Sequence, residues 1–192
     1  LLEGSSSSGR AKPAAGQAVG ARPPRCYLRS MSQPGVPAAT TAESAPAVAP
    51  DAVVAHAERL CAARGQRFTA LRRRVLRLIA EADRPLGAYD LLALLGAEGE
   101  RVAPPTVYRT LDFLAAQGLV HRVHSKNAFV VCRAAGAPHS AALLICSVCG
   151  RVREVPCTAL ERHVVEHARD HDFAVDSIAV EARGRCAVCR ET

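Results

Sequence analysis

Two closely spaced pairs of cysteines constrain this chain more than any other feature of its sequence. Cys146 and Cys149 form one Cys-x2-Cys pair, and Cys186 and Cys189 form a second pair forty positions later. Zn²⁺ accepts four thiolates in a tetrahedron, and two such pairs brought together by folding supply that set. The separation exceeds the spacing within a single zinc finger, so the pattern favours a structural zinc that joins the beginning and the end of one domain. A disulfide pair, an iron–sulfur cluster and coincidence are the alternatives.

The use of cysteine and the lengths of the apolar runs indicate the compartment. Four of the eight cysteines have metal-ligand spacing, which favours a metal over a secreted disulfide framework. The N-terminal segment lacks the apolar stretch of a signal peptide, and the longest apolar run, Ala141 to Cys146, is far shorter than the roughly 18 residues that span a bilayer. We therefore expect a cytoplasmic protein with no membrane partner.

Residues 1–50 consist largely of Ser, Gly, Pro, Ala and Thr, with few large apolar side chains. Such a composition cannot bury enough surface to offset the entropy of ordering, so we expect a disordered tail. Met31 is a plausible native start, and part of the tail is then added or upstream sequence. Cys26 lies in this tail and is not expected to be a ligand.

Residues 51–132 combine helical periodicity with a hairpin. Apolar residues recur at helical spacing over 51–64, 69–82, 88–95 and 107–117, with Asp51 and Thr69 as caps. Two short strands, 119–124 and 128–132, follow. The last three of these helices followed by the hairpin have the order of a winged helix-turn-helix, whose last helix enters the major groove of DNA. The net charge of +7, of which +4 belongs to residues 51–192, permits nucleic-acid binding without requiring it.

Residues 133–140 are predicted to form a hinge, because they contain Gly136 and Pro138. Beyond them we expect strands at 141–146 and 151–155, a helix at 158–170 and a strand at 173–182. This second unit, 141–192, is small enough to need a structural metal or a dimer partner. The predicted fold class is therefore α+β, with an N-terminal winged helix-turn-helix and a small C-terminal α/β domain.

Four further residues have side chains that can bind a metal. His121 and Cys132 stand at opposite ends of the hairpin, His139 lies at the end of the hinge, and Glu154 follows the first cysteine pair. Taken singly, each is more simply explained as a surface or core residue. Together they form a set of two nitrogens, one sulfur and one oxygen, which suits zinc better than ferrous iron.

Residues 51–192 resemble the ferric uptake regulator superfamily, and specifically its zinc uptake regulator branch. The matching segments are Ala-Tyr-Asp-Leu-Leu at 88–92, Pro-Pro-Thr-Val-Tyr-Arg-Thr-Leu-Asp-Phe-Leu at 104–114, Ile-Cys-Ser-Val-Cys-Gly at 145–150 and Cys-Ala-Val-Cys at 186–189. The resemblance implies a homodimeric repressor that binds double-stranded operator DNA of zinc-uptake genes when zinc is bound. It also implies that the C-terminal unit is a dimerisation domain and that the protein is not an enzyme and has no small organic substrate.

The resemblance implies two zinc ions per chain. It places Cys146, Cys149, Cys186 and Cys189 in a structural site, and His121, Cys132, His139 and Glu154 in a regulatory site at the hinge. Many relatives carry a His-rich run before the first cysteine pair, and iron-type relatives have a histidine where this chain has Ile178. A third site is therefore not expected, and His163, His167 and His171 are better explained as a solvated helix face.

The resemblance also indicates how DNA is read. It implies that Tyr108 contacts the duplex and that Arg109 reads a purine, with Thr106 beside them. Packing of Tyr108 and pairing of Arg109 with an aspartate is the alternative. The other candidate contacts, to phosphate rather than to bases, are the arginines before and within the second helix: Arg64, Arg67, Arg72 and Arg73. For the arginines within the helix, a solvated face is the alternative.

Three other functions fit less well. The same architecture could sense iron, manganese, nickel or peroxide, but Cys132 argues against this. A zinc hydrolase would need His-Glu-x-x-His, which the sequence lacks, and a zinc deaminase would need His-x-Glu followed by Pro-Cys-x-x-Cys, whereas the His-x-Glu at 56–58 has no such partner motif. A zinc buffer without DNA binding does not explain the basic helix followed by a wing.

Overall fold

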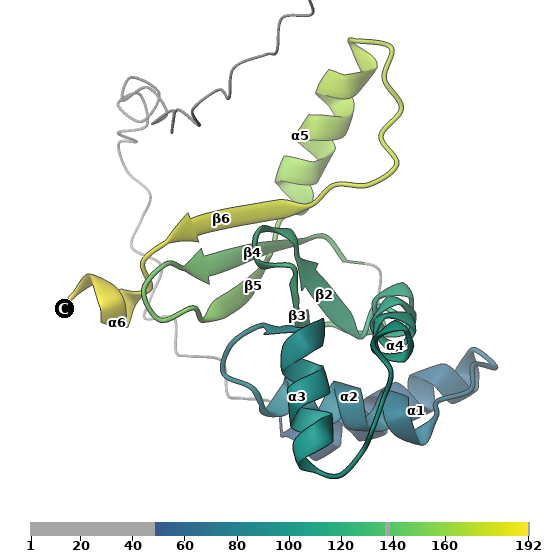
Figure 1. Ribbon diagram of the computed structural model, residues 1–192. Coiled ribbons are helices and arrows are strands. Elements are labelled where there is room, and N and C mark those ends of the chain that lie inside the picture. Colours follow the sequence, from purple (N-terminus) through teal and green to yellow (C-terminus); the bar gives the residue numbers. More distant parts are fainter. Residues whose placement is uncertain (1–48, 137–138, 192) are drawn as a thin grey trace, which may run out of the picture. The chain divides into compact units, whose positions relative to one another are not determined.

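A computed structural model describes residues 49–136 and 139–191 of the chain (Figure 1). The predicted tail, including Met31 and Cys26, lies almost entirely outside these residues, as do two residues of the predicted hinge, 137 and 138. Among the described residues, no helix combines the length and apolarity needed to cross a bilayer.

Four helices form the first part of the described chain. They are α1 Pro50–Ala63, α2 Ala70–Glu81, α3 Ala88–Ala97 and α4 Pro104–Ala116. The Thr69 hydroxyl caps α2 by accepting a hydrogen bond from the Arg72 N–H at 3.4 Å, as predicted. Asp51 lies in the first turn of α1 and is not its cap, because Pro50 already occupies the first helical position. Gly96 does not end α3, which continues to Ala97.

The predicted hairpin is part of a three-stranded sheet. Strands β2 Val120–Val123 and β3 Ala128–Val131 pair antiparallel, and the 3-10 helix η1 His124–Lys126 joins them. A third strand, β1 Leu86–Gly87, pairs with β3 on its other side. We call β2, η1 and β3 the wing. Strand β1 was not predicted, because two residues carry no periodicity.

The helices and the first sheet enclose one apolar core. The exposed faces of α2 and α4 are polar, and their other faces supply fully buried side chains. The largest fully buried side chains of this core, from these helices, from α3 and from the residue before β2, are Leu76, Leu91, Leu95, Leu111, Leu114, Leu119, Val75 and Val107. Thr110 is buried as well, but its hydroxyl donates to the Thr106 carbonyl at 2.9 Å, so no polar group is left unpaired there.

A second sheet follows the hinge. Its strands are β4 Ala141–Cys146, β5 Val152–Pro156 and β6 Val180–Gly184, with β4 in the middle (Figure 1). The helix α5 Thr158–Arg169 connects β5 to β6, and the short helix α6 Ala187–Arg190 follows β6. The strand predicted at 173–182 is wrong in its first half. Strand β4 pairs with β6 only from Val180 onward, so residues 173–179 have no partner strand in the described chain.

The wing packs against the second sheet through a small apolar cluster. Val123 is fully buried and lies against Leu143 and Ile145 of β4, with Val130 and Val152 at the edges. The first half of the predicted hinge contacts α1, because the His56 Nε2 lies 2.8 Å from the Ala135 carbonyl. The wing and the second sheet are therefore in direct contact, which the sequence did not predict.

Candidate metal centres

The two cysteine pairs meet in what we call the four-cysteine cluster. Cys146 ends β4, Cys149 lies in the following turn, Cys186 precedes α6 and Cys189 lies within α6. All four sulfur atoms lie within 4.8 Å of one another, and the Cys149 and Cys186 sulfurs are 3.9 Å apart. A tetrahedron with zinc–sulfur bonds of about 2.3 Å has sulfurs about 3.8 Å apart, so the spacing fits zinc.

Local hydrogen bonds build the turn that carries the first pair. The Cys146 N–H donates to the Arg151 carbonyl at 2.9 Å, and the Gly150 N–H donates back to the Cys146 carbonyl at 3.1 Å. Gly150 has a φ of 73°, which few other residues adopt. The Ser147 N–H bonds to the Gly184 carbonyl at 2.8 Å and thereby ties this turn to the approach to the second pair.

The four-cysteine cluster contains thiols of very different acidity. Backbone N–H groups of Cys186, Cys149 and Val148 point at the Cys146 sulfur and lower its pKa to about 5. The Cys186 donor lies 3.5 Å away. Hydrogen bonding with Cys186, followed by burial, raises the pKa of Cys189 to about 12. A cation is needed for all four sulfurs to be thiolates together, and a divalent metal supplies it.

The four other candidate ligands also converge, in what we call the mixed cluster. His121 comes from β2, Cys132 directly follows β3, His139 lies at the end of the hinge, and Glu154 comes from β5. Their four ligand atoms lie within 4.8 Å of one another. The His139 Nε2 is 2.9 Å from the Glu154 Oε1, 3.4 Å from the His121 Nε2 and 3.3 Å from the Cys132 sulfur.

These separations match the edges of a small coordination tetrahedron. Zinc–nitrogen and zinc–oxygen bonds of about 2.0–2.1 Å place neighbouring ligand atoms about 3.3 Å apart. The Glu154 Oε1 is 3.2 Å from the His121 Nε2. Its other oxygen, Oε2, accepts the Arg133 N–H at 2.9 Å, which orients the carboxylate toward both imidazoles. The donor set and its spacing therefore fit zinc.

The charges in the mixed cluster favour a cation. Burial raises the pKa of Glu154, but hydrogen bonds from His121 and from the Arg133 N–H outweigh it and lower the pKa to about 2. The Glu154 carboxylate is therefore ionised at neutral pH. Burial and then the charge of Glu154 raise the pKa of Cys132 to about 11. Cys132 must consequently lose a proton before it can bind a metal.

The histidines of α5 do not form a comparable group. The rings of His163 and His167 are 4.5 Å apart, and the His167 Nδ1 is 3.8 Å from Asp170. Across residues 49–136 and 139–191, only the four-cysteine and mixed clusters bring together three or more ligands.

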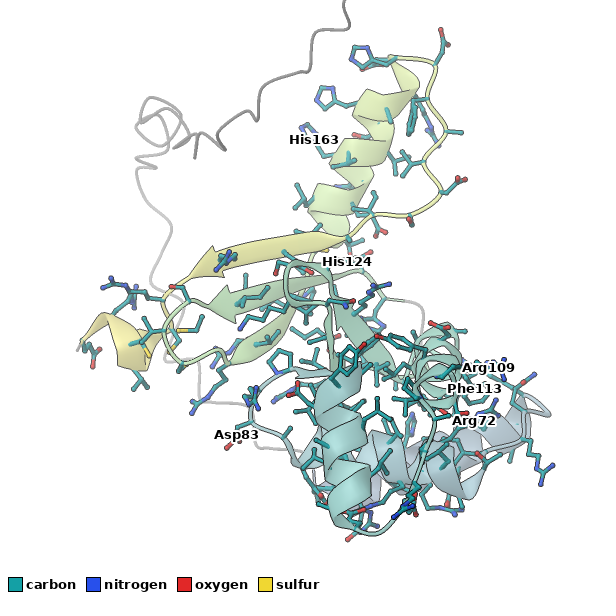
Figure 2. All side chains as sticks on the ribbon, viewed as in Figure 1. Arg72, Asp83, Arg109, Phe113, His124 and His163 are labelled. Carbon is teal, nitrogen blue, oxygen red and sulfur yellow. The ribbon has the colours of Figure 1, made fainter. Side chains whose placement is uncertain are left out.

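Helix α4 presents the residues predicted to contact DNA. Thr106, Tyr108 and Arg109 lie on its exposed face, opposite the buried Val107 and Leu111, and Figure 2 shows Arg109 beside Phe113. Three of the four arginines predicted to contact phosphate have partners inside the domain. Arg64 donates to the Gln117 carbonyl at 2.8 Å, Arg73 pairs with Glu58 at 2.6 Å, and Arg72 lies 3.4 Å from the centre of the Phe113 ring.

Comparisons with known proteins show which family the chain belongs to. Residues 63–183 match the profile of the Ferric uptake regulator family. The chain belongs to this family. It is 43% identical to the Zinc uptake regulation protein of Escherichia coli (strain K12) over 140 residues, which cover 72% of this chain and 82% of that relative. The protein of the same name from Mycobacterium tuberculosis (strain ATCC 25618 / H37Rv) is 34% identical over 128 residues, which cover 67% of this chain and 98% of that relative.

A solved structure in the family has the same fold. It is a zinc uptake regulator complexed with zinc and DNA, with a TM-score of 0.72 and 41% identity, covering 75% of this chain and 97% of that one. As in the family's other members, an N-terminal winged-helix domain is followed by a C-terminal dimerisation domain. One linking residue was missed from the sequence: Glu181, which contacts the wing. It has no sequence signal beyond its residue type.

Proposed function

We propose that the protein is a zinc-dependent transcriptional repressor that binds operator DNA of zinc-uptake genes as a homodimer, with zinc as the co-repressor. The mixed cluster carries this proposal, because its ligands come from the wing, from the end of the hinge and from the second sheet. A metal bound there links the DNA-binding domain to the dimerisation domain. The similarity to zinc uptake regulation proteins supports the same function.

Zinc is the metal that the ligands favour. Zinc accepts a thiolate beside imidazole and carboxylate, whereas ferrous iron favours harder ligands than Cys132. Two zinc ions per chain are proposed, one in each cluster. Four protein ligands complete a tetrahedron and leave no position for an activated water, so we propose no enzymatic activity. A regulator of the same fold that senses iron or another divalent metal is the second candidate.

A second copy of the chain is proposed to cover α5. No residue of this helix is buried, although it carries apolar side chains. Leu160 is 46% exposed and Val164 39%, and the nearby Phe173 is 65% exposed. Exposed apolar residues at helical spacing are typical of a protein interface. We propose a cytoplasmic location, because a repressor acts where its operator DNA lies.

Regulation is proposed to follow from the position of the mixed cluster. His121 and Cys132 move with the wing, whereas Glu154 belongs to the dimerisation sheet. Only one arrangement of the two domains brings all four ligands together, so metal binding selects that arrangement. A homodimer can then present both α4 helices to major grooves about 34 Å apart. By linkage, DNA tightens zinc binding by the same factor as zinc tightens DNA binding.

We propose that the exposed face of α4 recognises the base sequence of the DNA. Arg109 carries a fork of donors that matches the O6 and N7 of guanine, with Tyr108 and Thr106 alongside. Arg64, Arg67, Arg72 and Arg73 are proposed to contact phosphates. For Arg73 such a contact would compete with its ion pair to Glu58. These contacts would add affinity and salt dependence without choosing a sequence.

Binding to a duplex selected from a random library in the presence of zinc tests the proposal. Wild-type affinity is expected to rise about 100-fold between chelated and saturating zinc. A Cys132→Ser protein should remain folded and lose this rise, while Arg109→Ala should keep the zinc response and lose its preference over random DNA. Zinc-independent binding by the wild type would refute the proposal. A response to iron(II) in place of zinc would favour the second candidate.

A further inference from the structure

A carboxylate of the dimerisation sheet holds the tip of the wing. We propose that Glu181 is a positioning residue that, together with the mixed cluster, fixes the wing against the dimerisation sheet and thereby tunes zinc and DNA binding. The DNA part of this inference rests on the function proposed above. Glu181 is not a metal ligand and lies in neither ligand cluster.

Glu181 accepts two hydrogen bonds from the start of η1. Its Oε1 accepts the His124 N–H at 2.5 Å, and its Oε2 accepts the Ser125 N–H at 3.1 Å. The first N–H groups of a helix have no acceptor within the helix, so the carboxylate satisfies donors that would otherwise be unpaired. The His124 Nδ1 lies 3.6 Å from the same carboxylate, and Figure 2 shows His124 in this turn.

The burial and the charge of Glu181 strengthen these hydrogen bonds. Its side chain is only 14% exposed. Burial raises its pKa, but hydrogen bonds from the side chain and N–H of Ser125 and from the His124 N–H outweigh it and lower the pKa. The group is thus a partly buried carboxylate with its own set of donors, and charge-assisted hydrogen bonds of this kind are stronger than neutral ones.

The sheet register explains why Glu181 and the mixed cluster act on the same element. Leu143 of β4 pairs with Glu154 on β5 and with Glu181 on β6. Residues that are paired across neighbouring strands place their side chains on the same face of a sheet. Glu154 contacts His121 near the start of β2, and Glu181 contacts His124 directly after β2. Between them Leu143 packs with Val123. Glu154 and Glu181, which lie on the same face of the dimerisation sheet, therefore contact opposite ends of β2.

The two contacts differ in whether they depend on a metal. A metal bound in the mixed cluster would hold Glu154 and His121 together, whereas the contact of Glu181 with η1 needs only an ionised carboxylate. Glu181 therefore raises the population of the docked wing in the zinc-free protein. Less of the free energy of zinc binding is then spent on docking the wing. Without Glu181 the four ligands of the mixed cluster would be assembled for a smaller fraction of the time.

The test compares Glu181→Gln, which keeps the side-chain size, with Asp176→Asn, a change at an exposed carboxylate before β6. Zinc affinity of the mixed cluster is measured by chelator competition in full-length protein that retains its other zinc. Glu181→Gln is expected to weaken this zinc affinity about fivefold and the zinc-dependent DNA affinity about tenfold, with the control unchanged. Hydrogen exchange at the His124 and Ser125 amides should be faster in Glu181→Gln alone. If Glu181→Gln perturbs folding, Glu181→Asp replaces it, since retraction of the carboxylate should produce the same changes.

A local capping role would give a different result. Faster exchange at the two amides with unchanged zinc affinity would show that Glu181 only caps η1, and would overturn the inference. Unchanged exchange would overturn it as well. If the wild-type protein fails to bind DNA in response to zinc, the proposed function fails, but the zinc affinities still decide the role of Glu181. A Cys132→Ser/Glu181→Gln protein should bind DNA more weakly than Cys132→Ser alone, because Glu181 favours the docked wing even when the mixed cluster holds no zinc.

Discussion

The four-cysteine cluster and the mixed cluster contain the same number of ligands but join different parts of the molecule. All ligands of the four-cysteine cluster come from residues 146–189, within one small sheet and the helix that follows it. The mixed cluster takes ligands from both sides of the hinge. A metal in the first cluster can hold one domain together, whereas a metal in the second must hold two domains in one arrangement. Their positions therefore suggest a permanent site and a regulated site.

Each cluster contains a thiol that a metal would have to deprotonate. Backbone N–H groups lower the pKa of Cys146 to about 5, but hydrogen bonding with Cys186 and burial raise the pKa of Cys189 in the same cluster to about 12. Burial and the Glu154 charge raise the pKa of Cys132 to about 11. Zinc bound in either cluster would therefore displace a proton, and its affinity would fall at lower pH. The difference between the clusters lies in the domains that they join.

Loss of a ligand from the four-cysteine cluster should have the largest effect. Cys186→Ser is expected to unfold the second sheet, because structural zinc supplies about 10–16 kcal/mol of apparent binding free energy in small domains. Circular dichroism and sedimentation should show lost structure and lost dimer. Cys157→Ser is the matched control, since Cys157 lies outside both clusters and should leave fold and zinc content intact. A folded, dimeric Cys186→Ser protein would remove the distinction between the clusters.

Zinc affinity of the mixed cluster should depend on pH. The pKa of Cys132 is raised to about 11, so the thiol stays protonated across pH 7 to 9 in the metal-free cluster. Each zinc then releases one proton from Cys132, and its affinity should rise about tenfold per pH unit over this range. Calorimetry in buffers of different ionisation enthalpy counts the released protons. An affinity that does not change with pH would mean that Cys132 is not a ligand.

Removal of the histidines on α5 should have the smallest effect. His163 and His167 are exposed, and no third ligand joins them among the residues that the structure describes. A His163→Ala/His167→Ala protein should bind as much zinc as the wild type, and zinc should change its DNA affinity by a factor within about twofold of the wild-type value. Metal analysis and the DNA titration check this together. Loss of one zinc per chain would mean that a third site exists.

The sequence predicted those features whose signals are local. Thr69 caps α2, as its position directly before an apolar helical pattern predicted. The cysteine spacing indicated one ligand set directly. The mixed cluster required the resemblance as well, because single histidines and glutamates carry little information. The structure brings both sets of four residues together.

Features that depend on contacts distant in the chain were missed or wrong. Strand β1 exists because Leu86 pairs with Phe129, and the alternating pattern at 173–179 does not form a strand because β4 has no further residues to pair with it. The packing of Val123 on Ile145 and the contact of Glu181 with η1 likewise join distant segments. Periodicity cannot identify such partners, since it reports only which face of an element is apolar.

Stepwise removal of zinc tests the distinction between the clusters most directly. Purified protein should contain two zinc ions per chain, and a mild chelator should remove one of them. The protein should then keep its circular dichroism and its dimer mass, lose its affinity for the selected duplex, and recover it when one zinc is returned. Departure of both ions in a single step with unfolding, or DNA binding that survives removal of the first ion, would contradict the account.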